Sequence, residues 1–170
     1  MSPADRNAAV EAAFGRLSDA QCPYARFLGV TFERRGDELT ARLAYDPKLI
    51  GNPILPALHG GTTGAFLEIA AITELAWARV LGWIDEGGER AEAIAEGRFP
   101  PLPKPIDISV DYLRSGRPQQ TWARATVLRQ GRRIAYVRME AWQEERGKPI
   151  VCGHGHFLLP DANADAEGAA

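Results

Sequence analysis

The feature that most constrains the fold is a long segment, from Thr62 to about Arg79, that is apolar almost throughout. It is rich in Ala, Leu, Ile and Phe, and its only charged residues are Glu68, Glu74 and Arg79. A helix that is apolar on nearly all sides belongs in a protein interior, because it has no polar face to turn toward water. We therefore predict a buried central helix around which the rest of the chain folds.

Strand patterns on both sides of this segment supply the means to bury it. Apolar and polar residues alternate on either side of Gly36-Asp37, which predicts two strands and a tight turn within residues 27–46. The last third of the chain has four more strand-like segments, separated by short turns, at residues 106–115, 121–130, 132–145 and 148–159. These segments predict an antiparallel meander. An antiparallel sheet wrapped around the central helix buries it most simply, and the result is an α+β domain.

The remaining segments complete a single expected domain over residues 1–160. Apolar residues at helical spacing predict an amphipathic helix over residues 3–19. Residues 81–105 are interpreted as an insertion, in which a short charged helix over residues 86–95 leads into a proline-rich stretch. A connection of this length is often a lid or a binding element. Residues 161–170 contain too few apolar side chains to pack and are expected to be disordered.

The charge balance excludes some classes of function. The chain has 20 basic and 22 acidic residues, a formal net charge of -2, whereas a nucleic-acid-binding protein needs an excess of Lys and Arg to neutralise phosphates. No apolar run is long enough to span a membrane. The charged N-terminus lacks the apolar core of a secretory signal, and two cysteines are too few for a disulfide framework, so the cytoplasm is the expected location.

The start of the predicted central helix, LHGGTTGAFLE at residues 58–68, combines groups suited to chemistry. The first turn of a helix has N–H groups without intrahelical acceptors and carries partial positive charge. Glycine at this point lets another molecule approach the backbone closely. Gly60 and Gly61, next to His59, could therefore form an oxyanion hole for a carbonyl oxygen that becomes negative during a reaction. The alternative is a tight turn that needs glycine for its backbone conformation alone.

Glu68 is a carboxylate within the apolar part of this helix. Burial of a carboxylate is costly unless the group is paired or has a function. Residues 64–72 contain no obvious partner. The two interpretations are a catalytic role and a salt bridge to an arginine of the sheet, such as Arg124 or Arg138.

The spacing between the glycines and Glu68 along the helix also bears on whether the protein is an oligomer. Glu68 lies on nearly the same face as Gly61 but ~10 Å further along the axis. One substrate carbonyl cannot contact both the glycine amides and Glu68 of a single helix. Two antiparallel helices related by a twofold axis would place Glu68 of one subunit opposite Gly60 of the other, which favours a homodimer with two composite sites.

With these residues the chain resembles the hotdog-fold acyl-CoA thioesterases of the PaaI (phenylacetate-pathway) type. In that family His-Gly-Gly opens the central helix, and an Asp or Glu follows at the spacing of Glu68 from His59. The resemblance extends to IDISVDYLRSGRP and ARATVLRQGRRIAYVRMEAW and covers residues 24–160. It implies a curved antiparallel sheet around the central helix, here with an extra N-terminal helix. It also implies a homodimer at least and often a homotetramer.

The resemblance further implies hydrolysis of an acyl- or aryl-CoA thioester to coenzyme A and a carboxylic acid, with the CoA thioester as substrate and no cofactor. By family position, Gly60 supplies the N–H that polarises the thioester carbonyl, and Glu68 acts as general base or as nucleophile. Asn52 corresponds to an upstream polar residue that orients water or the carbonyl. It stands seven residues before His59, one more than in the relatives. His59 is a further candidate, for which a structural hydrogen-bonding role is the favoured alternative.

Coenzyme A carries phosphates, so basic residues are expected near the sheet edge. Two arginines after a hairpin turn match the nucleotide-contacting region of the family, and two more end the preceding strand segment. The alternative for each arginine is a solvated hairpin charge. The candidate substrate-binding residues are Gly61, Arg114, Arg117, Gln130, Gly131, Arg132 and Arg133.

Three potential metal ligands, Cys152, His154 and His156, lie on one face of a predicted strand at a period of two residues. Such a trio could bind zinc. No fourth ligand is evident, and short side chains along one strand seldom converge on one ion. We therefore expect no metal site.

The same residues leave two other functions open. A hotdog hydratase or dehydratase, acting on an enoyl or 3-hydroxyacyl thioester, pairs an acid with a catalytic histidine, and His59 would have to fill that role. A non-catalytic acyl-CoA-binding or sensing module needs the glycines and the arginines but not Glu68. Thioester hydrolysis accounts for the whole set, and the sequence does not specify the acyl group.

Overall fold

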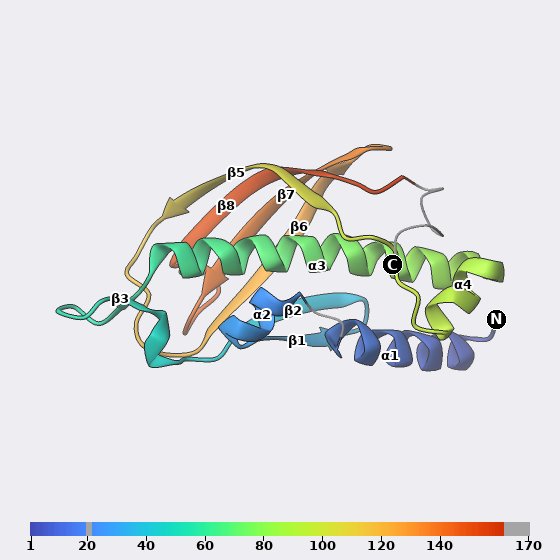
Figure 1. Ribbon diagram of the computed structural model, residues 1–170, viewed down its shortest axis with the longest axis horizontal. Helices are drawn as coiled ribbons and strands as arrows, with labels where there is room; N and C mark the ends of the chain where they lie inside the picture. The colour runs from blue at the N-terminus through green and yellow to red at the C-terminus, as the bar shows by residue number, and fades with distance from the viewer. Residues whose placement is uncertain (20–21, 162–170) are drawn as a thin grey trace.

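A computed structural model describes residues 1–19 and 22–161 of the chain. The helix α3, Gly60–Glu86, lies along the concave side of a curved antiparallel sheet (Figure 1). The six strands of this sheet follow the order β1-β2-β6-β7-β8-β5. They are β1 Val30–Arg35, β2 Glu38–Leu43, β5 Lys104–Tyr112, β6 Thr121–Gln130, β7 Ile134–Trp142 and β8 Val151–Leu158. The predicted α+β architecture, a sheet around a central helix, is confirmed.

The central helix is longer at both ends than the apolar segment predicts. It begins at Gly60 and continues into the predicted insertion as far as Glu86. It ends there because Gly87 and Gly88 both have positive φ, 74° and 65°, a conformation that glycine adopts at little cost. The short charged helix α4, Gly88–Ala95, begins after this change of direction, so its predicted start at residue 86 is wrong.

The predicted order of the last four strands is wrong in one place. β6, β7 and β8 form the expected meander, but β5 pairs with β8 and forms an edge of the sheet. The connection over residues 113–120 is long enough for this, because eight extended residues reach about 26 Å, whereas three strand spacings take about 14 Å. The amides of Leu113 and Arg114 donate to the Ile150 carbonyl and hold the start of this connection beside β8.

Several short elements precede α3. The predicted N-terminal helix is confirmed as α1, Pro3–Asp19. It is followed by a short helix that the sequence pattern did not indicate, α2, Pro23–Leu28. The loop before α3 contains a small hairpin of β3, Ile50–Asn52, and β4, Ala57–Leu58, which projects from the left of the molecule in Figure 1.

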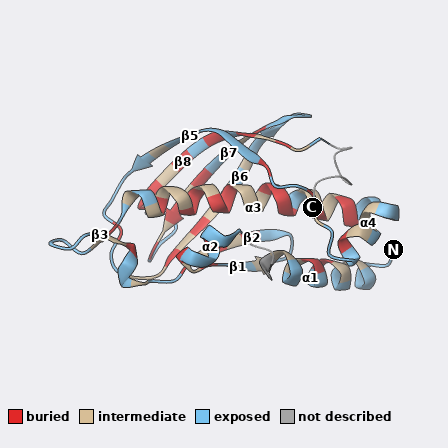
Figure 2. Cartoon of the chain, in the orientation of Figure 1, coloured by how far each residue is buried: buried red, intermediate tan, exposed pale blue. Residues whose placement is uncertain are grey.

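Buried residues, red in Figure 2, occur along α3 and on the strands beside it, and their side chains form two clusters. The larger cluster lies between the N-terminal half of α3 and the sheet and includes Phe66, Leu67 and Phe157. The second surrounds the C-terminal half of α3, where α1 and α4 pack, and includes Trp77 and Trp83. No described helix is both long and apolar enough to cross a membrane.

The predicted tail begins with a residue that has contacts. Asp161 is the last described residue, and its carboxylate accepts a hydrogen bond of 2.6 Å from Arg133. Its backbone carbonyl accepts another, of 3.1 Å, from Arg79. Asp161 is therefore held to the domain, contrary to the expectation of disorder from residue 161. Residues 162–170 lie outside the described residues.

Candidate active site

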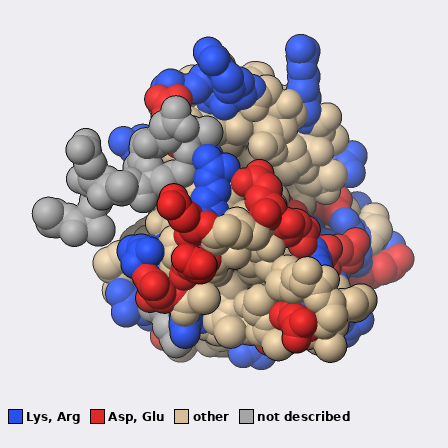
Figure 3. All heavy atoms as spheres, turned by 90° about the vertical axis from the view of Figure 1, so that its right-hand side faces the viewer, with Lys and Arg blue, Asp and Glu red and all other residues tan. Residues whose placement is uncertain are grey.

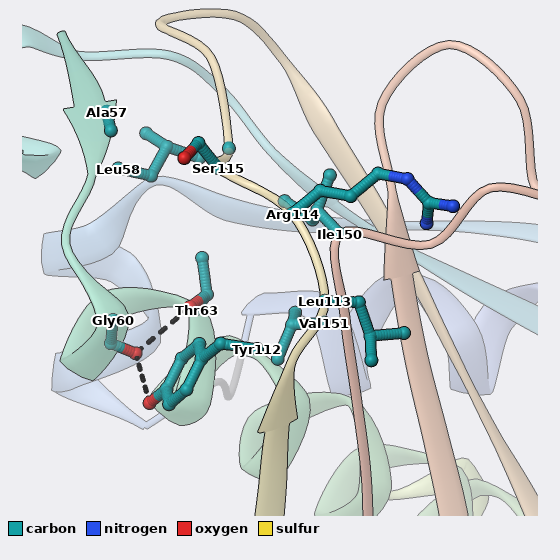
Figure 4. Close-up of a pocket in the computed structure, with 11 residues that line it drawn as sticks. Ala57, Leu58, Gly60, Thr63, Tyr112, Leu113, Arg114, Ser115, Ile150 and Val151 are labelled. Carbon is teal, nitrogen blue, oxygen red and sulfur yellow. Dashed lines mark hydrogen bonds between the residues drawn. The ribbon is translucent and has the colours of Figure 1, made fainter. Parts of the chain in front are cut away.

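A hollow of about 430 Å³ opens at the N-terminal end of α3, between the helix, β4 and the end of β5 (Figure 4). Leu58, Ile150 and Val151 contribute apolar surface to it, and Gly60 and Tyr112 contribute polar groups. Its volume is within the range of about 300–1,000 Å³ that is usual for small-molecule sites. Of the predicted His59-Gly60-Gly61 segment, Gly60 lines this cavity of ligand size.

His59 holds the start of α3 in place. Its backbone N–H donates to the Leu49 carbonyl at 2.8 Å, and its ring Nδ1 accepts from the Gly61 N–H at 2.9 Å. Gly51 packs against it so closely that an added Cβ would lie 2.7 Å from the His59 Cα. This is the helix-capping, structural role expected of His59 from its position.

The Gly60–Gly61 peptide group is held at its carbonyl end as well. The Tyr112 hydroxyl and the Thr63 Oγ1 each donate to the Gly60 carbonyl at 3.0 Å (Figure 4). Neither residue was predicted from the sequence, because nothing in a local pattern reveals that Tyr112 contacts a residue 52 positions earlier. Thr63, three residues after Gly60, could have been found from the tendency of Ser and Thr to bond to nearby backbone.

The Gly60 N–H differs from the next three amides of α3 in its hydrogen bonding. The amides of Thr62 and Thr63 donate to the His59 carbonyl, and that of Gly61 donates to the His59 ring. Within residues 1–19 and 22–161, the Gly60 N–H donates to no acceptor. As the first residue of α3, Gly60 also lies at the positive end of the helix dipole. This amide is suited to a carbonyl oxygen or an anion.

Glu68 lies on α3, about 12 Å along the axis from Gly60. It is half-buried, and no hydrogen bond or ion pair joins its carboxylate to another described residue. The two arginines named as alternative partners do not pair with it. Arg124 is bonded to Glu38 and Thr40, and Arg138 is an exposed residue of β7. Glu68 is therefore available, but too distant from Gly60 to act with it within one chain.

Glu74 is a second carboxylate on α3, and it was not predicted as a site residue. Burial raises the pKa of Glu74 to about 7, while Arg124 lowers this pKa and Glu38 raises it. The Glu74 carboxylate has no hydrogen bond to another residue of the described chain. The signal in the sequence was the same as for Glu68, a charge within an apolar helix.

Asn52 lies in the β3–β4 hairpin, where its side chain organises the turn. Its Oδ1 accepts hydrogen bonds from the amides of Ile54 and Leu55, at 3.0 and 3.2 Å. Its side-chain oxygen is thus committed to local structure. Only its Nδ2 is left to approach a substrate.

The candidate arginines do not gather at one place. Arg114 lines the hollow near Gly60, and its guanidinium donates to the Pro149 carbonyl at 2.6 Å. Arg117 forms an exposed ion pair with Glu144.

The Gln130-Gly131-Arg132-Arg133 turn, by contrast, joins β6 to β7 at the other end of the sheet. The register places Tyr112 opposite Val151 and Ile134 opposite Leu158 on β8. The separation along that strand is about 23 Å. Figure 3 shows basic side chains gathered at the top of this end of the molecule, where Figure 1 places the β6–β7 turn.

The residues considered for zinc do not converge. The ring of Tyr136 stacks on His156 at 4.8 Å and meets His154 edge-on at 5.9 Å. His156 Nδ1 lies 3.0 Å from an oxygen of Asp107, and this contact lowers the pKa of Asp107. Among the described residues, no three His, Cys, Asp or Glu side chains are grouped closely enough to hold a metal ion.

The β5 edge presents an apolar surface beside the hollow. The outer edge of β5 pairs with no described strand, and Ile106, Tyr112 and the following Leu113 are each more than half exposed. A long edge strand with exposed apolar side chains is a ready template for pairing with another chain. The site therefore borders a surface suited to a second copy.

The chain is similar to known proteins over most of its length. Residues 52–158 match the family described as the acyl-CoA thioesterase N-terminal domain. The medium/long-chain acyl-CoA thioesterase YigI of Escherichia coli K12 is 34% identical over 139 residues, which cover 78% of this chain and 83% of YigI. A Shewanella oneidensis structure related to the thioesterase superfamily is 25% identical with a TM-score of 0.72, covering 94% of this chain and 100% of that one. A Bacillus halodurans protein solved with CoA has a similar fold, with a TM-score of 0.61 at 16% identity, covering 92% and 93%.

Proposed function

Since this chain belongs to the acyl-CoA thioesterase family and has its hotdog fold, we propose that it hydrolyses medium- or long-chain acyl-CoA at two composite sites of a homodimer. One observation carries the proposal. Among residues 1–19 and 22–161, neither the Gly60 N–H at the start of α3 nor the Glu68 carboxylate on the same helix has a hydrogen-bonding partner, and the two groups are too far apart to act together in one chain. A second, antiparallel copy of the helix would place a Glu68 carboxylate opposite each Gly60 N–H.

The two groups have complementary roles in this proposal. The Gly60 N–H donates to the thioester oxygen, and that hydrogen bond strengthens as negative charge develops in the tetrahedral intermediate. Glu68 of the other subunit takes a proton from water, or attacks the carbonyl carbon directly and forms an anhydride that water then cleaves. In both routes the thioester C–S bond breaks, and the products are CoA thiol and a carboxylic acid. The Nδ2 of Asn52 is proposed to orient the water or the carbonyl, while His59 acts by capping the helix.

The β5 edge supports the proposed dimer. Antiparallel pairing of β5 with its twofold mate would cover Ile106 and Leu113 and continue the sheet across the two subunits. It would also set the two α3 helices antiparallel to one another. This is the arrangement that brings Glu68 toward the Gly60 of the other copy.

The same arrangement would unite the separated basic residues. Within one subunit the hollow with Gly60 and Arg114 is about 23 Å along the sheet from the β6–β7 turn with Arg132 and Arg133. A twofold axis beside β5 would bring the turn of one subunit toward the hollow of the other. We propose that these arginines bind the phosphates of CoA across the interface.

The acyl class rests on the relatives. YigI is named a medium/long-chain acyl-CoA thioesterase and is 34% identical to this chain. The apolar walls of the hollow, Leu58, Ile150 and Val151, are compatible with an alkyl substrate. Medium- and long-chain groups are therefore proposed ahead of short-chain and aryl groups.

Location and higher assembly complete the proposal. We place the protein in the cytoplasm, because Cys22 and Cys152 are both free thiols and reducing compartments keep thiols unpaired. A homotetramer built from two such dimers is proposed from the family resemblance. Size measurement of the purified protein in solution would distinguish dimer from tetramer.

The test is thiol release from a panel of short-, medium-, long-chain and aryl acyl-CoAs, with Glu68→Gln measured in parallel. Release by the wild type, fastest with medium or long chains, and a loss of at least ~100-fold in the variant are expected for an acid–base group. Binding without release would favour the sensing module. Release that survives Glu68→Gln would retain the reaction and remove Glu68 from the mechanism.

A further inference from the structure

The peptide group between Gly60 and Gly61 is bonded at both of its polar ends. Its N–H donates to the His59 ring at 2.9 Å, and its carbonyl accepts from both the Tyr112 hydroxyl and the Thr63 Oγ1 at 3.0 Å. Three side chains therefore fix one peptide plane. The adjacent N–H, that of Gly60, is the group left for the substrate.

The Tyr112 ring lies directly against this stretch of backbone. A Cβ at Gly60 would lie 3.2 Å from ring carbons of Tyr112, and one at Gly64 would lie 3.6 Å from the hydroxyl oxygen. The ring thus occupies the space that a side chain at residue 60 would need. Tyr112 belongs to β5, so it also ties the edge of the sheet to the start of the helix.

Glycine has more backbone freedom than any other residue, and two adjacent glycines at an oxyanion site would allow the Gly60 N–H to point in several directions. A donor contributes fully to catalysis only when it already points at the developing charge. The bonds to the Gly60 carbonyl restrict rotation about the Gly60 Cα–C bond, because the peptide bond on the other side of the carbonyl is already planar. Because the Gly60 backbone is held in this way, the direction of its N–H varies less.

We infer that Tyr112 and Thr63 are positioning residues, whose hydroxyl groups hold the Gly60 backbone so that its N–H is aimed at the thioester oxygen. The inference rests on the proposed role of Gly60 in thioester hydrolysis. Neither hydroxyl needs to touch the substrate. Their removal lowers kcat more than it changes KM.

Paired substitutions separate the hydroxyl groups from the rest of each side chain. Tyr112→Phe keeps the ring against Gly60 and removes only the donor. Thr63→Val removes the hydroxyl, whereas Thr63→Ser keeps it and removes the methyl group. Tyr136→Phe, on the outer face of the sheet beside His154 and His156, is a control for the loss of a tyrosine hydroxyl elsewhere.

The expected result is a fall in kcat of about tenfold for Tyr112→Phe and for Thr63→Val, the effect of one hydrogen bond. KM stays within about twofold, and Thr63→Ser and Tyr136→Phe retain wild-type kcat. The double variant Tyr112→Phe/Thr63→Val loses more than either single variant. Wild-type kcat in Tyr112→Phe, or a loss confined to KM, would overturn the inference, since the latter would make Tyr112 a substrate contact.

A second measurement does not depend on activity. Amide hydrogen exchange at Gly61, followed by NMR, is expected to accelerate in Tyr112→Phe and Thr63→Val but not in Thr63→Ser or Tyr136→Phe, because the peptide is then held less firmly. Unchanged exchange at Gly61 would refute the inference that the Tyr112 and Thr63 hydroxyl groups hold this peptide. Failure of the wild type to release thiol from any acyl-CoA would instead refute the proposed function, so the two failures are distinguishable.

Discussion

The two halves of α3 both bury apolar side chains, but they differ in the polar groups that they carry. The N-terminal half begins with glycines and borders a hollow, and within the described chain the Gly60 N–H and the Glu68 carboxylate have no hydrogen-bonding partner. The C-terminal half is enclosed by α1 and α4, with Trp77, Val80 and Trp83 buried. The indole N–H of Trp77 donates to the Asp37 carbonyl at 3.1 Å.

This difference indicates a division of roles. Polar groups left free, as at the N-terminal half, reduce stability, because an unsatisfied group near the interior costs free energy. Apolar burial along both halves, against the sheet and against α1 and α4, offsets that cost. The whole helix is thus anchored, and its N-terminal half also carries the groups proposed to serve the reaction.

The largest expected effect is on stability, at the C-terminal half of α3. Trp77→Ala removes a fully buried side chain and its hydrogen bond to Asp37, so the free energy of unfolding should fall by about 3–5 kcal/mol. Thiol release per folded molecule should change little, because the site lies at the other end of the helix. Denaturant unfolding checks the first expectation and steady-state kinetics the second. Leu128→Ala, at an exposed position, is the control and should change stability by no more than about 0.5 kcal/mol.

The next effect is on catalysis, at the N-terminal half of α3. Gly60→Pro removes the proposed oxyanion donor, and the backbone permits it, since proline suits the first position of a helix and His59 already has the extended conformation required before proline. We expect a loss of kcat of about 100-fold or more.

The matched control for this variant is Gly60→Ala. It adds a Cβ against the Tyr112 ring, as proline does, but it keeps the N–H. Its loss of kcat should be clearly smaller than that of Gly60→Pro. Equal losses would assign the effect to crowding of Tyr112 and not to the missing N–H.

Glu74, between the two halves, provides a pH-dependent comparison. The pKa of Glu74 is raised from the usual 4.5 to about 7 by burial, so the folded chain holds this proton more tightly than the unfolded chain. The contribution of Glu74 to stability therefore falls as pH rises from 4.5 to about 7 and then stays constant. Glu74→Gln does not ionise and should be more stable than the wild type by about 1–2 kcal/mol at pH 8, and by much less at pH 5. A gain of equal size at both pH values, in denaturant unfolding, would contradict this account of Glu74.

The smallest effect is expected in the β3–β4 hairpin. Asn52→Ala removes the acceptor for the Ile54 and Leu55 amides and should lower the free energy of unfolding by about 0.5–1 kcal/mol. Asn52→Asp keeps that acceptor and should retain stability, but it lacks the NH₂ group. If the NH₂ orients water or the carbonyl, both variants lose activity. Activity retained by Asn52→Asp would limit Asn52 to the turn.

The sequence predicted the parts of the fold that depend on local pattern. The apolar run after Thr62 indicated the buried helix, and period-two alternation indicated the strands. Strand order depends on contacts distant in the chain, which is why β5 was placed beside β6 although it pairs with β8. The hairpin before α3 was missed because its strands are too short to show alternation.

The same distinction applies to the site. Gly60 and Glu68 stand out locally, one as part of a glycine pair at a helix start and the other as a charge among apolar residues. Tyr112 was not predicted, since its hydrogen bond to Gly60 exists only after β5 packs beside α3. The distance between the β6–β7 turn and the hollow was also invisible before the register of the sheet was known.

The composite site is the central claim, and subunit mixing tests it most directly. Gly60→Pro and Glu68→Gln should each be nearly inactive alone. If each site takes Gly60 from one subunit and Glu68 from the other, a mixed dimer has one intact site and one site with both defects. Equal amounts, allowed to exchange subunits, should recover about a quarter of wild-type activity, because half of the dimers are mixed and half of their sites are intact. A mixture no more active than the sum of the two variants, with exchange verified, would contradict the composite site.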